Sequence, residues 1–517
     1  MTSALRLAVL GAGGRGADAY GRWVRAHPDR ARIVGVADPA PARLDALAGT
    51  TAARYADWRD LVADLGHLRP DAVLIALPDA LHVPAATAVA QAGLPMLLEK
   101  PAAPTLTGLT DLAQVVRRTG ARIAVGHVLR FAPFWRAVRA VVASGTLGDL
   151  ATIEVRENIG FWHFAHSFVR GNWRNAAGSS PMVLAKTCHD LDLIRWLAGA
   201  SPQSVSSEGS LLHFRPENAP AGAPERCTDG CPAAASCPFY APRYYVDALR
   251  DVTSHPVAML GDDLSPAGRI AALRRGPYGR CVYRCDNDVA DHQQTLLRFA
   301  SGLTATLTAS AFTAENTRHL AITGTRGQLH GHLGSGEIRV DLFSPSGGLP
   351  EALLSEAGAE VVSSGTVSSG TVSSGTVSSG TVSSGAAGPL GHPAWTLVAR
   401  ADTVAADHRG HAGGDDGLMD AFCRAVADGT VGTGELSFAT ALDSHLMAFA
   451  AEESRTGAGA VDFPAWARTA LGSAGLESAG LESAGLESAG LESAGLESAG
   501  LGSAGLGSAG PGSTGSA

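Results

Sequence analysis

The feature that most constrains the fold is a glycine-rich turn directly after the first apolar run. Residues 7–10, Leu-Ala-Val-Leu, are followed by Gly11, Gly13 and Gly16 in the spacing G-x-G-x-x-G, and then by a helix-forming stretch. A second apolar run, Ile33–Ala37, ends at Asp38. A strand, this turn, a helix and another strand form a βαβ unit of a parallel sheet.

The same turn predicts a dinucleotide site. Glycines permit a tight turn and let backbone amides approach a pyrophosphate at a helix N-terminus. Asp38 stands where an acidic residue bonds the adenosine ribose hydroxyls, which favours NAD over NADP. Arg43 follows closely and leaves NADP open as the alternative, because an Arg can pair with a 2′-phosphate.

Short apolar runs alternate with helix-length segments over the first 126 residues, as expected for a doubly wound parallel Rossmann sheet. After about Val128, alternating stretches such as Gln294–Phe299 and Leu303–Thr308 indicate antiparallel strands. The predicted fold class is therefore α/β, with an N-terminal Rossmann domain and a C-terminal α+β domain that carries a large, mainly antiparallel sheet.

Two low-complexity segments interrupt this pattern. Residues 366–385 are four copies of TVSSG, and residues 476–500 are five copies of LESAG. Gly and Ser dominate, and one Leu in five residues fits neither helix nor strand, so we expect flexible segments. The predicted organisation is a dinucleotide-binding domain at 1–126, a substrate and oligomerisation domain at 127–345 and 394–470, a flexible loop at 346–393 and a disordered tail at 471–517.

Composition excludes several classes of protein. Lys plus Arg number 40 against 49 Asp plus Glu, a net charge of −9, which argues against a nucleic-acid partner. No apolar run is long enough to span a bilayer, and the first residues lack the pattern of a signal peptide. Seven Cys without an export signal favour a reducing compartment, so a cytoplasmic location is expected.

Lysine is almost absent, which draws attention to its two positions. Of the 40 basic residues only Lys100 and Lys186 are Lys, leaving 38 Arg. Arg stays protonated in proteins, whereas a Lys can give and take a proton. Lys100 lies in Glu99-Lys100-Pro101, directly after the apolar run Met96–Leu98 and therefore at the carboxyl edge of the sheet, where ligands of such folds bind.

The chain resembles the Gfo/Idh/MocA family of NAD(P)-dependent oxidoreductases. The residues that carry the resemblance are the Gly11–Gly16 turn, Pro78 with His82, Glu99-Lys100-Pro101, Gly148-Asp-Leu, the helix start His189-Asp190-Leu191-Asp192, and the Gly-rich stretch His411–Asp415. The resemblance covers roughly residues 5–345 and 394–465.

The resemblance implies which residues act on the substrate. In the family the Lys of Glu-Lys-Pro and the His of the later helix lie about the nicotinamide and handle the substrate hydroxyl; here these are Lys100 and His189. Removing the hydroxyl proton while the carbon gives up a hydride needs such groups. Asp192, one helical turn after His189, is expected to orient a partner or cap the site.

One family position differs. Most of the family has an Asp four residues before the His, where this chain has Ala185, and Lys186 stands next to it. We therefore expect Lys186 to take part in the proton relay or to hold a substrate carboxylate or hydroxyl. The alternative is an ordinary surface Lys.

The residues expected to contact the cofactor are Gly11, Gly13, Arg15, Gly16, Asp38, Arg43, Pro78, His82, Glu99 and Lys100.

Five aromatic residues lie close together between Asn158 and Arg174, with His and Arg interleaved. Their irregular spacing after a strand suits a loop that lines a polyol pocket, although an aromatic group of this kind is also typical of a core.

Five of the seven cysteines also cluster. The spacing is C-x3-C-x5-C at Cys227, Cys231 and Cys237, then C-x3-C at Cys281 and Cys285. Four thiolates closing a tetrahedral zinc would stabilise these Gly- and Pro-rich loops. Free thiols or disulfides are the alternative, and an iron–sulfur cluster is a further one.

The predicted function is an NAD(P)-dependent oxidoreductase that transfers hydride between the nicotinamide and a secondary hydroxyl of a sugar, cyclitol or related polyol. Two alternatives stay open: an NAD-dependent glycosidase with retained cofactor, and a non-catalytic NAD(P)-sensing regulatory protein. The resemblance also implies a homo-oligomer, a dimer or tetramer.

Overall fold

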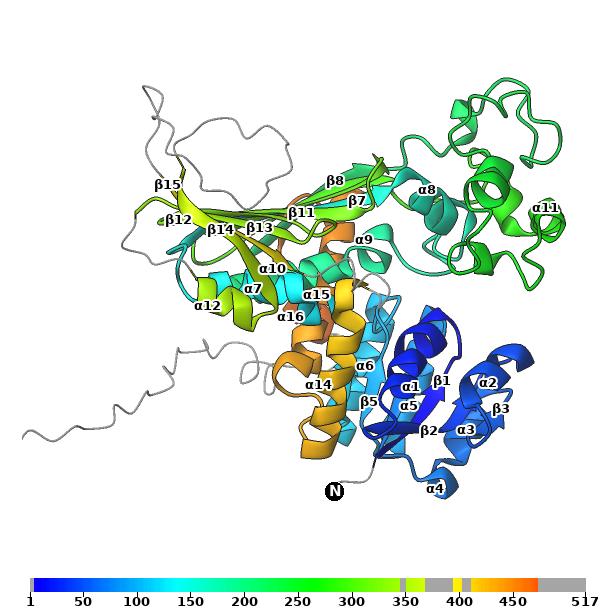
Figure 1. The fold of residues 1–517 in the computed structure, drawn as a ribbon, viewed down its shortest axis with the longest axis horizontal. Helices are drawn as coiled ribbons and strands as arrows, with labels where there is room; N and C mark the ends of the chain where they lie inside the picture. Colours follow the sequence, from blue (N-terminus) through cyan, green and yellow to red (C-terminus); the bar gives the residue numbers. More distant parts are fainter. Residues whose placement is uncertain (1–3, 345–349, 368–393, 402–410, 473–517) are drawn as a thin grey trace, which may run out of the picture.

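The computed structural model describes residues 4–344, 350–367, 394–401 and 411–472. These residues form two domains, one built on a six-stranded sheet and one on a ten-stranded sheet (Figure 1). No helix in these ranges is both long and apolar enough to cross a membrane.

The N-terminal domain is a parallel sheet with the strand order β3-β2-β1-β4-β5-β6. Its strands are β1 (Leu5–Leu10), β2 (Ala31–Ala37), β3 (Ala53–Tyr55), β4 (Ala72–Ile75), β5 (Met96–Leu98) and β6 (Ile123–Val125). The helices between them are α1 (Arg22–Ala26), α2 (Pro41–Ala48), α3 (Trp58–Ala63), α4 (Leu65–Leu68), α5 (His82–Gln91) and α6 (Leu106–Thr119). The central strands are buried on both faces, which explains their continuous apolar runs.

Strand register brings the expected ligand-binding residues to one edge. Leu10 pairs with Ala37 and Ile75, Ile75 pairs with Leu98, and Leu98 pairs with Val125. The residues that follow these strands therefore meet at the carboxyl edge of the sheet. Local signals set the helices: the Thr105 hydroxyl caps α6 by accepting from the Gly108 amide, and Gly120 ends the helix with a φ of 66°.

The second domain contains a sheet with the order β14-β15-β13-β12-β11-β7-β10-β9-β8-β16. Its strands are β7 (Leu150–Gly160), β8 (Ser204–Ser210), β9 (His292–Arg298), β10 (Thr304–Thr313), β11 (Thr317–Gly324), β12 (Gly327–His332), β13 (Glu337–Leu342), β14 (Ala359–Val367), β15 (Ala394–Ala401) and β16 (Val461–Asp462). Strands β7 and β10 run parallel, and the other neighbours are antiparallel. The predicted fold class is confirmed.

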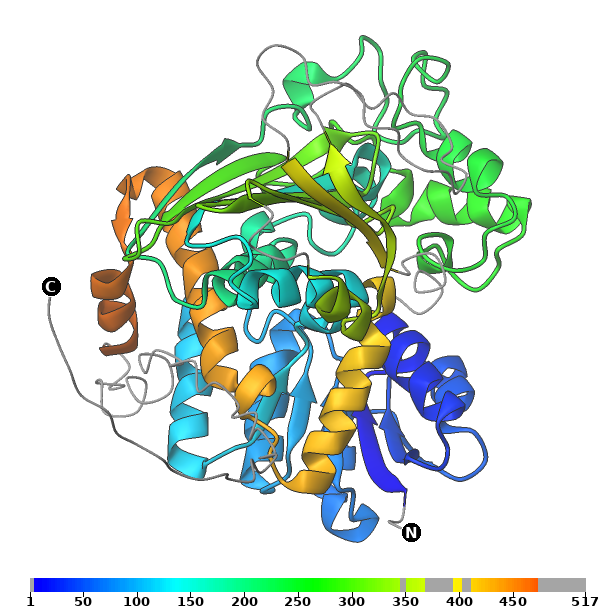
Figure 2. The same cartoon turned by 60° about the vertical axis from the view of Figure 1, so that its left-hand side comes forward.

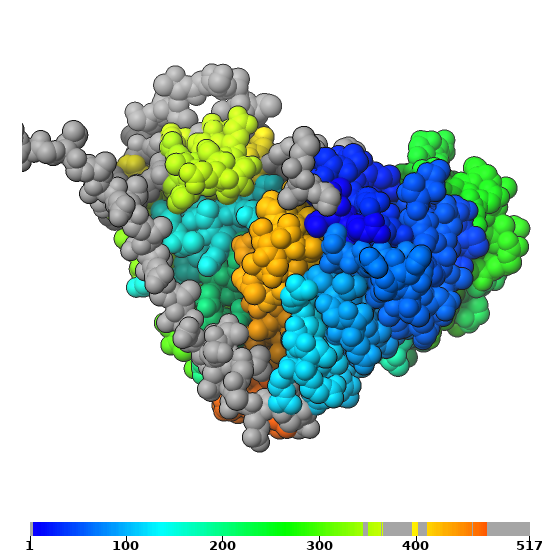
Figure 3. All heavy atoms as spheres, turned by 90° about the horizontal axis from the view of Figure 1, so that it is seen from below, coloured from blue at the N-terminus to red at the C-terminus, as the bar shows by residue number. Residues whose placement is uncertain are grey.

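Helices pack against one face of this sheet and connect it to the first domain (Figures 1 and 2). They include α7 (Pro133–Ala143), α9 (Met182–Ala185), α10 (Cys188–Ala198), α12 (Glu351–Glu356), α14 (Gly414–Asp428), α15 (Phe438–Glu453) and α16 (Phe463–Gly472). Seen from below, α14 lies between the N-terminal domain and the rest of the second domain (Figure 3). One continuous core links both sheets through these helices.

An insertion between β8 and β9 projects from one end of the sheet, where Figure 1 shows it in green. It contains one regular helix, α11 (Pro266–Arg275), and several short helical turns. A second segment, after β7, holds α8 (Phe161–Phe164) and a further helical stretch, Ala165–Arg170, and packs against the insertion.

The prediction that 346–393 form a flexible loop is wrong for residues 350–367. Residues 350–367 contain α12 and β14, and β14 pairs with β15 in an antiparallel ladder. The Val and Thr residues of this segment suit a strand, and the partner that they pair with lies beyond the repeat. Likewise α16 continues to Gly472, inside the predicted tail. The remaining parts of the predicted loop and tail, 368–393 and 473–517, lie outside the described residues.

Candidate active site

The glycine-rich turn at the end of β1 is closely packed at two positions and open at one. Gly11 has a φ of +94°, and a Cβ there would lie 2.3 Å from the Ala76 carbonyl oxygen. A Cβ on Gly16 would lie 1.9 Å from the carbonyl oxygen of Gly11. A Cβ on Gly13 meets nothing within 4 Å. The first and third glycines are thus required by the protein itself, whereas Gly13 leaves space beside the turn.

Asp38 fixes this turn from the end of β2. Its Oδ2 accepts from the Ala12 amide and its Oδ1 accepts from the Ala40 amide, both at 2.9 Å. The side chain is buried. Each carboxylate oxygen has a second lone pair that can still accept from a ribose hydroxyl. Arg43, one turn into α2, is exposed.

Arg15 and Glu99 bind each other. The Arg15 Nε lies 2.6 Å from Glu99 Oε1, and its other nitrogens reach Asp415 at 2.8 Å and the Tyr20 hydroxyl. Tyr20 also donates to Glu99. Burial alone would raise the pKa of Glu99, but Arg15 and Tyr20 lower it on balance. These two side chains therefore join the turn to the second domain, and their charged groups are already paired.

His82 and Pro78, which were also predicted to contact the cofactor, differ in burial. His82 is buried, and its ring nitrogens lie 2.7 Å from the Pro101 carbonyl oxygen and 2.8 Å from that of Leu77. It ties the Glu99-Lys100-Pro101 turn to the end of β4. Pro78 is exposed at the start of the turn that precedes α5.

Lys100 of the first domain and His189 of the second lie close enough for the charge of one to act on the other. Lys100 Nζ donates to the Ala185 carbonyl oxygen at 3.2 Å, and among the described residues no carboxylate forms an ion pair with it. His189, near the start of α10, is buried, and neither ring nitrogen has a hydrogen-bond partner among the described residues. Burial lowers the pKa of His189 well below its usual range, and the Lys100 charge lowers it further. Burial therefore favours the neutral ring, and both of its nitrogens lack a hydrogen-bond partner among the described residues.

Two further histidines lie beside His189, and a third, His445, lies beside one of them, His127. The His127 and His411 rings lie 5.7 and 6.0 Å from that of His189, centre to centre. His127 and His445 are buried, and burial lowers their pKa to about 3 and about 4. His127 was not among the predicted site residues, but its place just after β6, at the carboxyl edge of the sheet, is a signal that could have identified it.

Asp192 forms a buried ion pair with Arg130. Both of its oxygens accept from the buried Arg130 guanidinium, at 2.6 and 2.5 Å, in a bidentate pair. Burial alone would raise the pKa of Asp192, but Arg130 and His127 hold it below its usual range. Asp192 Oδ1 also lies 3.7 Å from His127 Nε2, and the His127 ring is a neighbour of His189. The expectation that Asp192 orients a partner or caps the site stays a prediction.

Lys186 belongs to a second, charge-balanced group. Its Nζ lies 2.9 Å from Glu157 Oε1, and Arg318 joins Glu157 at 2.9 Å to Asp190 at 2.6 Å. Two cations thus meet two carboxylates at the core-facing side of β7 and β11. Lys100 and Lys186 differ in this respect, because only Lys186 has an ion-pair partner among the residues that the structure describes.

The aromatic segment is divided between core and surface. Phe164 and Phe168 are buried and stack on each other, and Phe164 also stacks on Phe214 of the insertion. Trp173 is partly exposed, and its Nε1 donates to Asp79 Oδ2 at 3.0 Å. Only part of this segment is therefore available to line a pocket.

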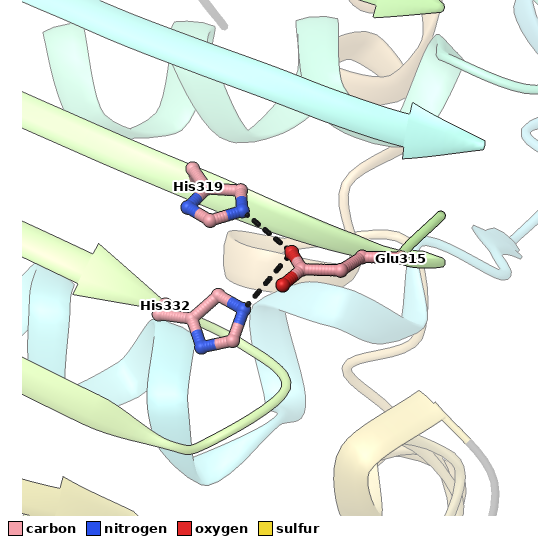
Figure 4. A group of neighbouring side chains, drawn as sticks. All are labelled: Glu315, His319 and His332. Carbon is pink, nitrogen blue, oxygen red and sulfur yellow. Dashed lines mark hydrogen bonds and ion pairs between the residues drawn. The ribbon is translucent and has the colours of Figure 1, made fainter. Parts of the chain in front are cut away.

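All seven cysteines are free thiols. Cys227, Cys231, Cys237 and Cys281 line one small cavity in the insertion, together with Arg170. Among the described residues, the group of metal-ligand side chains with all ligand atoms within 4.8 Å is a different one, Glu315, His319 and His332 (Figure 4). Its two histidines pair across β11 and β12, on the sheet face opposite the core residues Leu320 and Leu329.

Two family models match this chain, one in each domain. The model of the oxidoreductase family with the NAD-binding Rossmann fold matches residues 5–127, and the model of the GFO/IDH/MocA C-terminal domain matches residues 135–250 and 232–330. Together the matches exceed half of the chain. The chain belongs to the Gfo/Idh/MocA family.

Two of the relatives that the chain matches are named as oxidoreductases or dehydrogenases. The inositol 2-dehydrogenase of Corynebacterium glutamicum (strain R) is 31% identical over 226 residues, 41% of this chain and 61% of that protein. The putative oxidoreductase YteT of Bacillus subtilis is 23% identical over 265 residues, 50% of this chain and 60% of that protein. The chain thus matches about three fifths of the length of these relatives.

Solved structures share the Gfo/Idh/MocA fold over nearly their whole length. Levoglucosan dehydrogenase in complex with NADH and levoglucosan superposes with a TM-score of 0.58 at 17% identity, covering 89% of this chain and 100% of that one. An oxidoreductase from Agrobacterium radiobacter, in complex with NAD+, L-tartaric acid and magnesium, gives 0.55 at 18% identity, covering 90% and 99%. At this identity the likeness concerns the fold.

Proposed function

We propose that this Gfo/Idh/MocA protein is an NAD-dependent dehydrogenase that oxidises a secondary hydroxyl of a sugar, cyclitol or related polyol. The observation that carries the proposal is an amine without a carboxylate partner, Lys100, whose charge acts on a buried imidazole with two unpartnered nitrogens among the described residues, His189. A buried polar group without a partner is costly unless a ligand completes it. The inositol and levoglucosan dehydrogenases named above support the substrate class.

The turn between β1 and the following helix fits a dinucleotide. The open space at Gly13 and the helix that begins at Gly14 provide backbone amides for a pyrophosphate. Asp38 supplies carboxylate oxygens for ribose hydroxyls and repels a 2′-phosphate, so we propose NAD rather than NADP. When bound, the nicotinamide accepts the hydride.

Lys100 and His189 would manage the proton. Lys100, once neutral, takes the proton of the substrate hydroxyl, and its contact with the Ala185 carbonyl holds the amine in place. His189 stays neutral because of its burial, so it offers one N–H donor and one acceptor to the same hydroxyl. Lys186, paired with Glu157, is assigned a positioning role rather than a proton relay.

The experiment is a turnover assay of the full chain with NAD or NADP across a panel of sugars, inositols and sugar acids, followed by NADH absorbance. Signal with one polyol and NAD is expected. Silence across the panel while the protein still binds NAD would overturn the dehydrogenase and favour a glycosidase with retained cofactor or a sensor. Signal with NADP alone would overturn the role given to Asp38 and assign the 2′-phosphate to Arg43.

We also propose that two or four copies of the chain associate through the sheet face opposite the packed helices. Leu296 on β9 and Phe312 at the end of β10 are among the exposed large apolar side chains, 47% and 44% exposed. Sedimentation of the full chain tests this, and a monomer at micromolar concentration would contradict it.

A further inference from the structure

The insertion between β8 and β9 has little regular structure to stabilise it. Residues 211–291 contain α11 and short helical turns. The apolar cluster that lies wholly within them is small, and their other buried apolar residues, such as Phe214 and Phe239, pack on the segment after β7. A segment of this length needs another source of stability if it is to keep one conformation.

The backbone brings its two cysteine-containing parts together. Arg226 and Arg280 form an isolated antiparallel bridge. The Cys227 amide donates to the Gly279 carbonyl, and the Cys281 amide donates to the Glu225 carbonyl, both at 2.9 Å. Cys227 and Cys281, more than fifty residues apart in sequence, are thereby held on facing chain segments.

Four of the five clustered cysteines share one cavity. Cys227, Cys231, Cys237 and Cys281 line it, and the turn from Cys231 to Cys237 is closed by the Cys237 amide donating to Ala233. Cys285 is excluded from this lining, since its thiol donates to the Cys281 carbonyl oxygen at 3.3 Å. No three of these sulfurs lie within 4.8 Å of one another, so the thiols must turn inward to share one ion. Three of the four lie in a turn-rich loop, which allows that rotation.

A buried cation without a carboxylate partner lies at the same cavity. Arg170 is 2% exposed. Its guanidinium donates to the carbonyl oxygens of Arg280 and Phe239, both at 2.8 Å, and to the Cys227 sulfur at 3.6 Å. In the described part of the chain no carboxylate pairs with it. A buried guanidinium normally requires a compensating negative charge. Thiolates at this cavity would supply it.

We propose that Cys227, Cys231, Cys237 and Cys281 bind one zinc ion, with Arg170 as the counter-charge. Four thiolates and Zn²⁺ carry two negative charges in total, which a buried guanidinium offsets in part. Sulfur ligands without histidine or carboxylate, and a closed coordination shell, are typical of a structural zinc rather than a catalytic one.

The centre would stabilise the contact between the insertion and the aromatic segment at Asn158–Arg174, which in turn contacts the first domain. Arg170 belongs to the same aromatic segment as Trp173, which bonds Asp79 of the N-terminal domain. His166 of this segment bonds the Tyr245 hydroxyl of the insertion at 2.7 Å and stacks on Tyr278. Zinc in the insertion would therefore stabilise the position of the segment that faces the first domain.

The test measures metal in the untagged full chain by mass spectrometry. One zinc per chain is expected in the natural protein and in Cys285→Ser, a matched variant whose thiol lies outside the cavity. Cys231→Ser should lose most of the zinc. His332→Ala should keep it, because that change removes the alternative group at Glu315, His319 and His332.

A second measurement covers the case in which Cys231→Ser does not fold. Cobalt exchanged into the natural chain should show the intense visible bands of a tetrahedral tetrathiolate, and Cys285→Ser should show the same bands. Weak bands, as for histidine and carboxylate ligands, or zinc lost in His332→Ala, would overturn the proposal. Iron with acid-labile sulfide, or a folded chain that takes up no zinc, would overturn it as well.

Discussion

Lys100 and Lys186 have similar sequence contexts, but their hydrogen-bond and ion-pair partners in the structure differ. Both fall in motifs of the family, but Lys186 is paired with Glu157 at 2.9 Å and Lys100 has a carbonyl partner. The scarcity of Lys directed attention to both positions. The ion pair could not be predicted, because Glu157 approaches Lys186 through the packing of β7 on the helices.

Lys100→Arg is expected to lower kcat by about 10²- to 10⁴-fold, because Arg keeps the charge but does not exchange its proton. NAD affinity should remain nearly unchanged. The matched variant Lys186→Arg keeps the ion pair with Glu157 and should retain most of the turnover. Steady-state kinetics with NAD binding measured by calorimetry distinguish the two. Full turnover in Lys100→Arg would rule out proton transfer by this residue.

The buried histidines predict that stability decreases with acidity. His127 and His445 have a pKa of about 3 and about 4 in the folded chain because of burial. Unfolded histidine takes up a proton near pH 6.5, so protons favour the unfolded chain as pH falls below that value. Each such histidine removes up to about 1.4 kcal/mol of stability per pH unit.

Urea unfolding between about pH 7 and about pH 5 measures this slope. His445→Gln should make the dependence shallower, since one group that takes up a proton on unfolding is removed. His319→Gln, at a half-exposed position of β11, is the control and should leave the slope as it is. Equal slopes in all three proteins would show that burial of His445 does not govern its protonation.

At the scale of elements, the turn after β1 and the strand ends were predictable. A local spacing fixes the glycine turn, and parallel strands deliver Asp38, Glu99 and His127 to one edge. The segment containing α12 and β14 was not predictable, since its strand depends on pairing with β15, beyond the TVSSG repeat. The pairings of Asp192 with Arg130 and of Arg15 with Asp415 also join distant elements, and no local pattern indicates them.

Two glycines of one turn should respond differently to the same substitution. Gly16→Ala places a Cβ 1.9 Å from the Gly11 carbonyl oxygen, so it should lower the melting temperature and NAD affinity together. Gly13→Ala meets nothing within 4 Å in the protein. It should leave the melting temperature nearly unchanged and weaken NAD binding by about tenfold or more, because its methyl group occupies cofactor space.

Thermal unfolding and titration with NAD give both quantities for each variant. Undiminished NAD affinity in Gly13→Ala would contradict the placement of the pyrophosphate beside this residue.

At the scale of the whole molecule, a row of ion pairs joins the two domains. Arg15, Arg22 and Arg30 near the start of the chain pair with Asp415, Asp416 and Asp420 of α14. Helix α14 therefore lies against the N-terminal domain, as Figure 3 shows. The pairs differ in burial: Asp415 is 3% exposed at its side chain and Asp416 is 21% exposed.

Because Asp415 and Asp416 differ in burial, the same substitution, Asp to Asn, should lower the free energy of unfolding by different amounts at the two positions. Asp415→Asn leaves Arg15 without one of its buried carboxylates and should reduce the free energy of unfolding by about 3 kcal/mol. Asp416→Asn removes a pair that is more accessible to water and should cost less than about 1 kcal/mol. Urea denaturation of both variants measures the difference. Equal losses of the free energy of unfolding would mean that burial of the Arg15–Asp415 pair adds nothing to stability.

The row of ion pairs also sets an order of events during synthesis. Arg15 and Asp415 are 400 residues apart. At about 5 to 20 residues per second, a ribosome that has released Arg15 needs about 20 to 80 s to add its partner. For that interval the nascent nucleotide-binding half lacks α14, the helix that covers its first turn. The contact between the two domains is thus completed late in translation, when α14 reaches the first helical turn of the chain.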